Sequence, residues 1–480
     1  MNDSVIDCDV AIIGAGSAGL PAYREVLRAG LRPLLIEGGP HGTTCARVGC
    51  MPSKLLIAAA AAAQAVREAP VFGIEAGPPR VDGRAVMRRV RELRDDFVRS
   101  VLVVVEDFPP EHRLDGYARF LDPHRLQVGD ETIVEAGRIV IATGSRPTYP
   151  GFFAEAGDLL ATSDDVFEWE DLPGSVAVFG GGIVGLELGQ ALHRLGVRMR
   201  LFGKDGAVGP LGDPAVRDYA AKTFAAEFPF DPDAKVGAIR RRDGQVEIVF
   251  EEGGEERVER FDRLLAATGR RPNVDRLGLE NSGLELDERG VPVFDRFTGQ
   301  CGDSHVFIAG DANDDAPLLH EASDEGKIAG DNAGRYPDVR AQTRRAPLGI
   351  VFCDPQIAIA GKSWRELQDE GADCAIGEVS FENQGRSRVV NENRGLLRVY
   401  GAHGSGLFLG AEMIGPAAEH IGHLLAWAAQ QALSVHEMLA MPYYHPVIEE
   451  GLRTALRRLN RQLRMGPELV PQCLDCGPGG

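Results

Sequence analysis

The sequence predicts an α/β protein made of two related units and a third, α+β domain, and three observations carry this prediction. A strand, a Gly-rich turn, a helix and a second strand follow one another near the N-terminus, and the same order returns from Val176 onward. From about Arg345 the pattern changes to strands mixed with a longer helix. A chain of 480 residues is also too long for one core and predicts about three domains.

In the first unit, residues 10–13 predict a buried strand, and residues 32–37 predict the strand that follows the helix. The second unit repeats this order with strands at 176–179 and 198–202. Four further elements are expected: strands at 138–142 and 263–267, each leading into Ala-Thr-Gly, a strand at 396–400, and a helix near 417–432.

The composition limits the partners of the protein. A formal net charge of −19 argues against nucleic acid or an anionic membrane. The most apolar helical stretch, residues 55–66, is too short to span a bilayer, and residues 1–9 are polar. Eight cysteines in 480 residues do not make a secreted disulfide scaffold, so we expect a cytoplasmic protein. In that compartment a close cysteine pair is more often redox-active or metal-binding than structural.

The turn after the first strand carries a G-x-G-x-x-G pattern, Gly14, Gly16 and Gly19. The first glycine allows a tight turn, the second lets the backbone approach a pyrophosphate, and the third lets the helix pack on the strand. The helix N-terminus adds the positive end of its dipole. Glu37 ends the next strand, where a carboxylate accepts hydrogen bonds from a ribose. The alternative, a Gly-rich turn without a ligand, is disfavoured by this context.

The second unit repeats the glycines at Gly180, Gly182 and Gly185. Counted from its first glycine, the position of the acid in the first unit is taken by Gly203, and Lys204 follows. A missing carboxylate removes both an acceptor for the ribose 2′-OH and a charge that repels a 2′-phosphate. The neighbouring lysine could attract that phosphate, which favours NADP(H) over NAD(H). The alternative, that Lys204 is a solvated loop lysine without a role in nucleotide binding, is nearly as good an interpretation.

The most informative segment is 42–54, Gly-Thr-Thr-Cys-Ala-Arg-Val-Gly-Cys-Met-Pro-Ser-Lys, which contains Cys45 and Cys50. Two cysteines this close, leading into a helix, can close a small ring. A helix N-terminus and Lys54 both favour the thiolate. A structural disulfide would need an oxidising compartment, and a zinc site would need further ligands nearby, of which none follows. The segment therefore predicts a redox-active disulfide.

This segment resembles the active-site signature of the class I pyridine nucleotide–disulfide oxidoreductases. Three further segments match that family in its own order: 185–189, 306–311 and 444–450. The resemblance covers nearly the whole chain and implies FAD, NAD(P)(H) and a homodimer. It places Asp311 on the ribityl chain of the flavin and pairs Glu187 with Lys54 beside the flavin ring.

The resemblance also assigns the catalytic roles. Cys50 is the thiol nearest the flavin, where its thiolate gives a charge-transfer contact, and Cys45 is the interchange thiol that meets the substrate. His445 is the acid/base catalyst, it is oriented by Glu450, and it acts in the site of the partner subunit. A histidine–carboxylate pair can form the attacking thiolate and protonate the leaving one near neutral pH, which supports this role independently.

The predicted organisation follows from these motifs. The expected domains are an FAD-binding domain at 1–148 and 275–345, an NAD(P)-binding domain at 149–274, a dimerisation domain at 346–465 and a flexible tail at 466–480. The residues expected to contact the cofactors are Gly14, Gly16, Gly19, Glu37, Lys54, Thr143, Gly144, Gly180, Gly182, Gly185, Glu187, Lys204, Gly269, Gly310 and Asp311. No metal site is expected.

Within the family, the cysteine pair with His445 and Glu450 is most similar to dihydrolipoamide dehydrogenase, whose substrate is a lipoyl dithiol. Gly203 departs from that pattern, which keeps an NADPH-dependent disulfide reductase open as an alternative. A tail pair, Cys473 and Cys476, could relay electrons outward, bind a metal or be idle. Outside this chemistry, the rival is a flavoprotein with a non-disulfide acceptor, and a non-catalytic binding module is more remote. The other cysteines are expected to be packing residues: Cys8, Cys301, Cys353 and Cys374.

Overall fold

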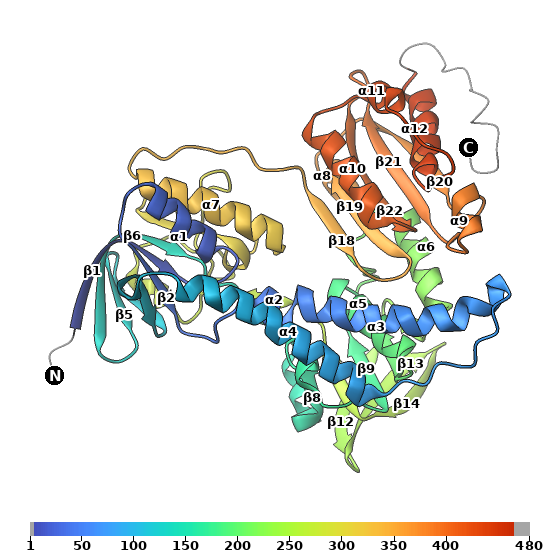
Figure 1. The fold of residues 1–480 in the computed structure, drawn as a ribbon, viewed down its shortest axis with the longest axis horizontal. Coiled ribbons are helices and arrows are strands. Elements are labelled where there is room, and N and C mark those ends of the chain that lie inside the picture. The colour runs from blue at the N-terminus through green and yellow to red at the C-terminus, as the bar shows by residue number, and fades with distance from the viewer. Residues whose placement is uncertain (1–3, 465–480) are drawn as a thin grey trace.

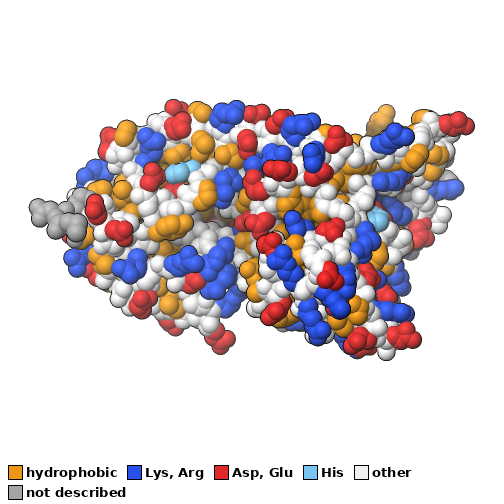
Figure 2. Space-filling model, turned by 90° about the horizontal axis from the view of Figure 1, so that it is seen from below, with side chains coloured by type: hydrophobic (Ala, Val, Ile, Leu, Met, Phe, Trp, Pro, Cys, Tyr) orange, Lys and Arg blue, Asp and Glu red, His pale blue; other side chains and the backbone are white. Residues whose placement is uncertain are grey.

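The computed structural model of the chain describes residues 4–464, so the tail with Cys473 and Cys476 lies outside the described residues. Three lobes are visible in Figure 1, each built on its own sheet, and the two cysteines of the redox segment lie on helices near their junction. Figure 2 shows basic and acidic side chains interspersed over the face seen from below. On that face the negative net charge is spread out and does not gather in one patch.

The first lobe contains a mainly parallel sheet in the order β3-β2-β1-β6-β5-β4, and β17 also pairs with β6. Its strands are β1 (Ser4–Ile13), β2 (Pro33–Glu37), β3 (Arg113–Asp115), β4 (Ala118–Asp122), β5 (Arg125–Val128), β6 (Thr132–Ile141) and β17 (Val306–Ile308). β1 is longer than the predicted strand 10–13, because residues 4–9, in which polar and apolar residues are mixed, pair with β6 from Ser4 opposite Thr132 onward. Hydrogen bonding to a long neighbour extends this strand where the apolar pattern does not.

The second lobe contains a fully parallel sheet in the order β11-β10-β9-β15-β8, with a three-stranded antiparallel sheet beside it. The parallel strands are β8 (Leu160–Thr162), β9 (Ser175–Phe179), β10 (Arg198–Phe202), β11 (Phe230–Asp231) and β15 (Arg263–Ala266). The antiparallel strands are β12 (Val236–Arg242), β13 (Gln245–Glu252) and β14 (Glu255–Phe261). The predicted strand 198–202 is confirmed to the residue. Two short strands, β7 (Ser145–Pro147) and β16 (Arg270–Pro272), pair where the chain enters and leaves this lobe.

The third lobe is an antiparallel sheet in the order β18-β19-β22-β21-β20 with helices packed on it. Its strands are β18 (Leu348–Val351), β19 (Gln356–Gly361), β20 (Cys374–Ser380), β21 (Leu396–Ala402) and β22 (Phe408–Gly415). Its helices are α8 (Trp364–Asp369), α9 (Gly385–Val389), α10 (Ala418–Gln430), α11 (Val435–Ala440) and α12 (Glu450–Leu463). The expected α+β character of this region is therefore confirmed.

Seven helices belong to the first two lobes: α1 (Gly19–Arg28), α2 (Thr44–Val48), α3 (Cys50–Glu68), α4 (Gly83–Glu106), α5 (Ile183–Arg194), α6 (Pro214–Ala225) and α7 (Leu319–Arg335). α3 leaves the first lobe and packs against α5 of the second (Figure 1). Leu56 of α3, Leu186 of α5 and Val351 of the third lobe share one hydrophobic core. By length and composition alone the helical segment Thr44–Phe72 could cross a membrane, and 17% of its most apolar window is buried.

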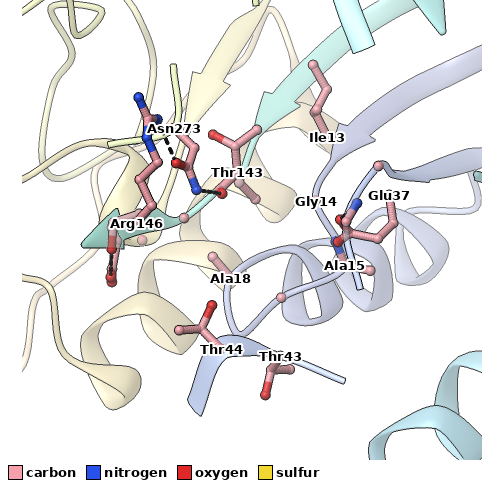
Figure 3. Close-up of a pocket in the computed structure, with 18 of the residues that line it drawn as sticks. Ile13, Gly14, Ala15, Ala18, Glu37, Thr43, Thr44, Thr143, Arg146 and Asn273 are labelled. Atoms are coloured by element: carbon pink, nitrogen blue, oxygen red, sulfur yellow. Dashed lines mark hydrogen bonds between the residues drawn. The ribbon is translucent and has the colours of Figure 1, made fainter. Parts of the chain in front are cut away.

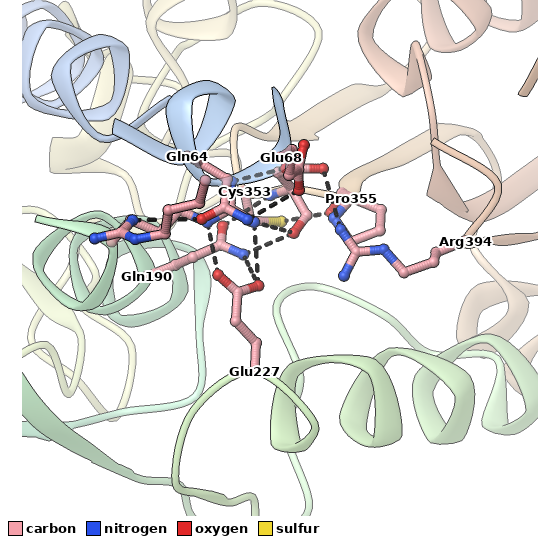
Figure 4. A network of polar contacts seen from close by, with 10 residues as sticks. Gln64, Glu68, Gln190, Glu227, Cys353, Pro355 and Arg394 are labelled. Atoms are coloured by element: carbon pink, nitrogen blue, oxygen red, sulfur yellow. Dashed lines mark hydrogen bonds and ion pairs between the residues drawn. The ribbon is translucent and has the colours of Figure 1, made fainter. Parts of the chain in front are cut away.

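One face of α5 also holds the third lobe through polar contacts (Figure 4). The Gln190 amide donates to the Asp354 carbonyl at 2.6 Å and accepts from the Asp354 N–H at 2.8 Å. One turn later the Arg194 guanidinium pairs with the Asp354 carboxylate at 2.7 Å and with Glu227 at 2.6 Å. Successive turns of one helix thus fix the loop between β18 and β19.

Candidate active site

The first Gly-rich turn is built so closely that two of its residues must be glycine. The Gly14 N–H donates to the Ile36 carbonyl at 2.7 Å, and a Cβ on Gly14 would lie 2.2 Å from the Ala142 carbonyl oxygen. A Cβ on Gly19 would lie 1.8 Å from the Gly14 carbonyl oxygen. Around Gly16, by contrast, the space that a Cβ would need is open. The turn therefore leaves its backbone free for close approach by a ligand at the N-terminus of α1.

Glu37 is held at the end of β2 by two backbone donors. Its Oε2 accepts from the Ala15 N–H at 2.8 Å and its Oε1 accepts from the Gly39 N–H at 2.8 Å, and Figure 3 shows it beside the Gly-rich turn. Each carboxylate oxygen has a second lone pair. The carboxylate is thus oriented and still able to accept hydrogen bonds from a diol.

A cleft of about 620 Å³ runs from this turn past Thr43 and Thr44 to Asp311. The Ser145 hydroxyl donates to the Asp311 carboxylate at 2.6 Å, which fixes that side chain. The Thr143 hydroxyl is buried and has no hydrogen-bond partner in the part of the chain that the structure describes. An orphaned hydroxyl in a cleft lined by a Gly-rich turn fits a dinucleotide, because a bound ligand can supply the missing contact.

The two Ala-Thr-Gly turns predicted from the sequence meet at the link between the first and second lobes. The Asn273 N–H donates to the Gly144 carbonyl at 2.9 Å, and the Thr148 N–H donates to the Gly269 carbonyl at 3.0 Å. Further along, the Gly310 N–H donates to the buried Glu325 at 2.8 Å. These glycines therefore shape the wall of the cleft and its edge toward the second lobe.

The second Gly-rich turn repeats the first in detail. The Gly180 N–H donates to the Phe202 carbonyl at 2.8 Å, and a Cβ on Gly180 would lie 2.2 Å from the Ala267 carbonyl oxygen. A Cβ on Gly185 would lie 1.8 Å from the Gly180 carbonyl oxygen, whereas the space at Gly182 is open. The turn is therefore equally suited to a pyrophosphate.

The residue that follows each second strand distinguishes the two turns. Gly203 occupies the place of Glu37, because each follows the residue whose carbonyl accepts from the first glycine. A Cβ on Gly203 would lie 2.6 Å from the carbonyl oxygen of Pro232. Sequence reasoning missed this packing, which gives the glycine a cause besides the nucleotide. Lys204 is 88% exposed, 4.0 Å from Asp205.

The redox segment forms two consecutive helices. Cys45 lies in α2, whose N-terminus is capped by the Thr43 hydroxyl, which accepts from the Ala46 N–H at 3.2 Å. Cys50 is the first residue of α3, and both cysteines are free thiols in this structure. The hydrogen bond from Cys45 lowers the pKa of Cys50 to about 7, and Lys54 acts in the same direction. The same hydrogen bond, together with burial, raises the pKa of Cys45.

The predicted pairing of Lys54 with Glu187 is confirmed. The Lys54 ammonium donates to both oxygens of the buried carboxylate, at 2.8 and 3.0 Å. The Phe352 N–H donates to the same carboxylate at 2.9 Å, and Lys54 lies 4.6 Å from the centre of the Phe352 ring. Phe352 comes from the third lobe and was not predicted, because no local pattern connects it with a lysine far away in the chain. All three lobes therefore fix the position of this lysine.

The predicted pairing of His445 with Glu450 is also confirmed. The His445 Nδ1 lies 3.1 Å from the buried Glu450 carboxylate, which also accepts from the Val447 N–H at 3.2 Å. The ring is 56% exposed, so its Nε2 faces outward. Among residues 4–464 no hydrogen bond joins His445 to either thiol. Within one chain, the acid/base pair and the cysteine pair therefore stay separate.

The other described cysteines differ in their surroundings. Cys8, Cys301 and Cys353 are buried in hydrophobic cores. Burial raises the pKa of each of these three thiols, which makes them poor nucleophiles. Cys374 is only half-buried at the start of β20.

Two family models match the chain. Residues 8–326 match the pyridine nucleotide-disulphide oxidoreductase model, and residues 348–456 match the dimerisation domain of the same family. The chain belongs to this family. Its members are FAD-dependent and use NAD(P)H, and the dimerisation domain supports a homodimer. The flavoprotein fold and the dithiol/disulfide oxidoreductase chemistry expected from the sequence are thereby confirmed.

Several curated family members are similar over almost their full length. A dihydrolipoyl dehydrogenase of Haloferax volcanii is 31% identical over 95% of this chain and 97% of its own. A mercuric reductase of Shigella flexneri is 30% identical over 95% of this chain and 81% of its own. Among solved structures, the flavoprotein disulfide reductase RclA of Escherichia coli is 22% identical with a TM-score of 0.79, over 96% of this chain and 100% of its own. LpdA of Mycobacterium tuberculosis, also 22% identical, reaches 0.80 over 94% and 99%.

As a family member, the chain is expected to hold FAD in the cleft that runs from Glu37 to Asp311. The turn that starts at Gly180 is then expected to bind the nicotinamide nucleotide. Bound FAD supplies a two-electron carrier between the nicotinamide and the cysteine pair. The dimerisation domain supports a homodimer, in which a second copy could bring its His445 to the first copy's cysteines.

Proposed function

We propose that this enzyme oxidises dihydrolipoyl groups with NAD(P)+, and the observation that carries the proposal is the oriented His445–Glu450 pair. Together with the exchange thiol Cys45, it provides an acid/base group for a substrate dithiol. Relatives named dihydrolipoyl dehydrogenase match over nearly the whole chain at 28–31% identity, which supports the same substrate class.

The exchange steps balance as follows. The partner's His445 takes a proton from one substrate thiol, and the resulting thiolate attacks the Cys45 sulfur, breaks the Cys45–Cys50 bond and releases Cys50 as a thiolate. The second substrate thiol then attacks the mixed disulfide, closes the substrate disulfide and releases Cys45, which takes up the proton that this second thiol loses. The histidine keeps the first proton, and Cys50 remains a thiolate. Bound FAD would carry the two electrons from the cysteine pair to NAD(P)+. The hydrogen bond from Cys45 stabilises the Cys50 thiolate that the first step produces.

The substrate is tested by comparing turnover of dihydrolipoamide and NAD+ with turnover of glutathione disulfide, thioredoxin disulfide and Hg²⁺ with NADPH. We expect dihydrolipoamide to give the highest kcat/KM. A higher kcat/KM for one of the NADPH-dependent acceptors would refute dihydrolipoamide as the substrate. It would not contradict the assignment of the redox centre.

The roles of the two thiols are tested by serine variants. Cys50→Ser is expected to keep FAD and to lose both turnover and the long-wavelength charge-transfer band of the partly reduced enzyme. Cys45→Ser is expected to lose turnover and keep the band, because the thiolate beside the flavin survives. The opposite pattern would exchange the two assignments.

The shared site is tested by complementation between subunits. His445→Ala is expected to lower dithiol turnover about a hundredfold or more, the usual cost of a lost general acid/base. Heterodimers of this variant with Cys45→Ser contain one intact composite site and should recover part of the activity. Absence of recovery after demonstrated subunit exchange would place His445 in the site of its own chain.

We further propose that NADPH is accepted at least as well as NADH, because no carboxylate stands at residue 203 to repel a 2′-phosphate. Gly203→Glu is an unsuitable test, since the new Cβ would meet the Pro232 backbone. Lys204→Glu introduces the charge on an exposed side chain and should shift the ratio of kcat/KM toward NADH by about tenfold. A strong NADH preference in the unaltered enzyme would refute the proposal.

A second candidate is an NADPH-dependent disulfide or metal-ion reductase, favoured by relatives named mercuric reductase at 30% identity. In that case Cys473 and Cys476, outside the described residues, would add a second two-electron couple. Reductive titration should then require more electrons than FAD and one disulfide take up. Truncation before Cys473 should remove the excess. An Ellman titration that finds both tail thiols free in the air-oxidised enzyme would exclude the relay.

A further inference from the structure

Arg47 lies in α2 between the two redox thiols and lines the first-lobe cleft. Its Nε is buried and has no hydrogen-bond partner among the described residues. Among residues 4–464 its guanidinium forms no ion pair with a carboxylate, and its backbone carbonyl accepts from Arg94 at 3.5 Å. A buried donor of this kind is costly unless something else in the cleft accepts its hydrogen bond.

The carboxylates that line the cleft do not supply this acceptor. Among residues 4–464 none of them bonds to Arg47, and each has other partners: Glu37 two backbone N–H groups, Asp164 Arg270, Asp275 Arg146, and Asp311 the Ser145 hydroxyl. Arg276 is the other cleft arginine without an ion pair among the described residues. Among residues 4–464 the cleft thus contains two guanidinium groups that form no ion pair, and such groups favour the binding of an anion.

The position of Arg47 indicates which part of a dinucleotide it meets. Its N–H donates to the Thr43 carbonyl at 3.1 Å, so it lies one turn beyond Thr43 and Thr44, which Figure 3 shows on the side of Ala18 at the start of α1. A Cβ on Gly42 would lie 3.5 Å from the Arg47 Cγ, so the stem of the side chain runs along Gly42. The start of α1 is where a helix dipole attracts a pyrophosphate. Arg276 instead follows Asp275, which pairs with Arg146, and Figure 3 shows Arg146 beside Asn273.

We propose that Arg47 binds the pyrophosphate of FAD, opposite the N-terminus of α1. The pyrophosphate carries two negative charges, and a guanidinium donates to phosphate oxygens in short, charge-assisted hydrogen bonds. Because Cys45 shares the five-residue helix α2 with Arg47, the cofactor also fixes the helix that presents the interchange thiol. Binding of FAD and ordering of the exchange site are thereby coupled.

The test measures FAD affinity of the reconstituted apoprotein by quenching of flavin fluorescence. Arg47→Met removes the charge and keeps the stem, and it should weaken FAD binding by about 10- to 100-fold, the range for a lost charged hydrogen bond. Arg47→Lys should recover part of that loss, since it restores a positive charge without the guanidinium geometry. Arg276→Met, the matched control, should change FAD affinity less than Arg47→Met.

A second measurement separates a pyrophosphate contact from a general structural effect. ADP and AMP are used as competitors of FAD, and Arg47→Met should weaken ADP much more than AMP. In the unaltered protein the preference for ADP over AMP should shrink as salt rises, a result that requires no variant. Equal losses for ADP and AMP, or unchanged FAD affinity, would overturn the proposal. So would a salt-independent preference for ADP. A changed pH profile of Cys50 alkylation with unchanged FAD affinity would assign Arg47 to the thiols instead.

Discussion

The two Gly-rich turns have almost the same backbone and different duties. At Gly14 and at Gly180 a Cβ would lie 2.2 Å from a carbonyl oxygen of the neighbouring strand, and the φ angles are 112° and 117°. After the second strand, however, the first unit has Glu37 gripped by two backbone N–H groups, whereas the second has Gly203 packed on Pro232. The backbone provides a generic pyrophosphate site, and one side chain decides how firmly the ribose is held.

The helices that follow the two turns, α1 and α5, also differ in one side chain. Seven residues after the first glycine, α1 has Pro21 and α5 has Glu187. Glu187 reaches across to Lys54, four residues beyond Cys50. We therefore expect the first unit to hold its nucleotide more firmly. The second unit, through Glu187, also fixes Lys54 beside the cysteine pair.

Substituting alanine for the first glycine of each turn should give the largest effects and should separate the functions of the two units. Gly14→Ala and Gly180→Ala create the same clash. The first should abolish FAD binding and all turnover. The second should keep the visible flavin spectrum and reduction by dihydrolipoamide, while oxidation of NAD(P)H falls about a hundredfold or more. Flavin absorbance of the purified proteins and anaerobic reduction with each donor measure this. Loss of flavin from both variants would show that the two turns are not functionally separate.

Removing the side-chain anchor of the first unit should have a smaller effect. Glu37→Ala takes away the oriented carboxylate and leaves the turn intact, so FAD affinity should fall by about 10- to 100-fold. Equilibrium binding to the apoprotein measures it. An unchanged dissociation constant would mean that Glu37 orients the turn and contributes nothing to the ribose.

The contribution of the second unit to the thiols should appear as opposite shifts in one pH profile. The hydrogen bond from Cys45 lowers the pKa of Cys50 to about 7, Lys54 acts in the same direction, and burial and Glu187 act in the opposite direction. Alkylation of the reduced enzyme requires the thiolate, so its rate rises with pH through that value. Lys54→Met should move the profile to higher pH and Glu187→Gln to lower pH, each by about one unit. Shifts in the same direction would show that the pair acts only as a structural unit.

Gly203→Ala should give the smallest change and still sharpen the comparison. Its Cβ would lie 2.6 Å from the Pro232 carbonyl oxygen, an overpacking that costs about 1–3 kcal/mol of stability. The preference between NADH and NADPH should stay constant, since no charge is added. Thermal unfolding and the ratio of kcat/KM for the two nucleotides check both expectations. An unchanged Tm would remove packing as the reason for the glycine.

Much of this architecture could be predicted because its signals are local. The strand at 198–202 and both glycine patterns depend on residues close together in the chain, and the structure reproduces them. The pairs Lys54–Glu187 and His445–Glu450 followed from family resemblance, and both form hydrogen bonds. No residue pattern alone would have joined Lys54 to Glu187, because sequence separation hides contacts between lobes.

The remaining features depend on contacts that leave no pattern in the sequence. Residues 4–9 lie outside the predicted strand 10–13, and their pairing with β6 adds them to it. Phe352 reaches Glu187 from another lobe through a backbone N–H, which every residue except proline carries. The packing of Gly203 on Pro232 likewise depends on a loop that the glycine pattern does not include. Such contacts are fixed by tertiary geometry and have no spacing to recognise.

The contacts that α5 makes near both of its ends restrict the motion of the second lobe. Its first turns hold Lys54 of the redox helix and its last turns hold Asp354 of the third lobe. A hinge rotation of the second lobe about β7 and β16 would have to pull the buried Glu187 and Arg194 away from their partners. The lobe is therefore braced at two points and behaves as a fixed wall. A nucleotide bound at the second Gly-rich turn would then have to enter and leave without a hinge motion of this lobe.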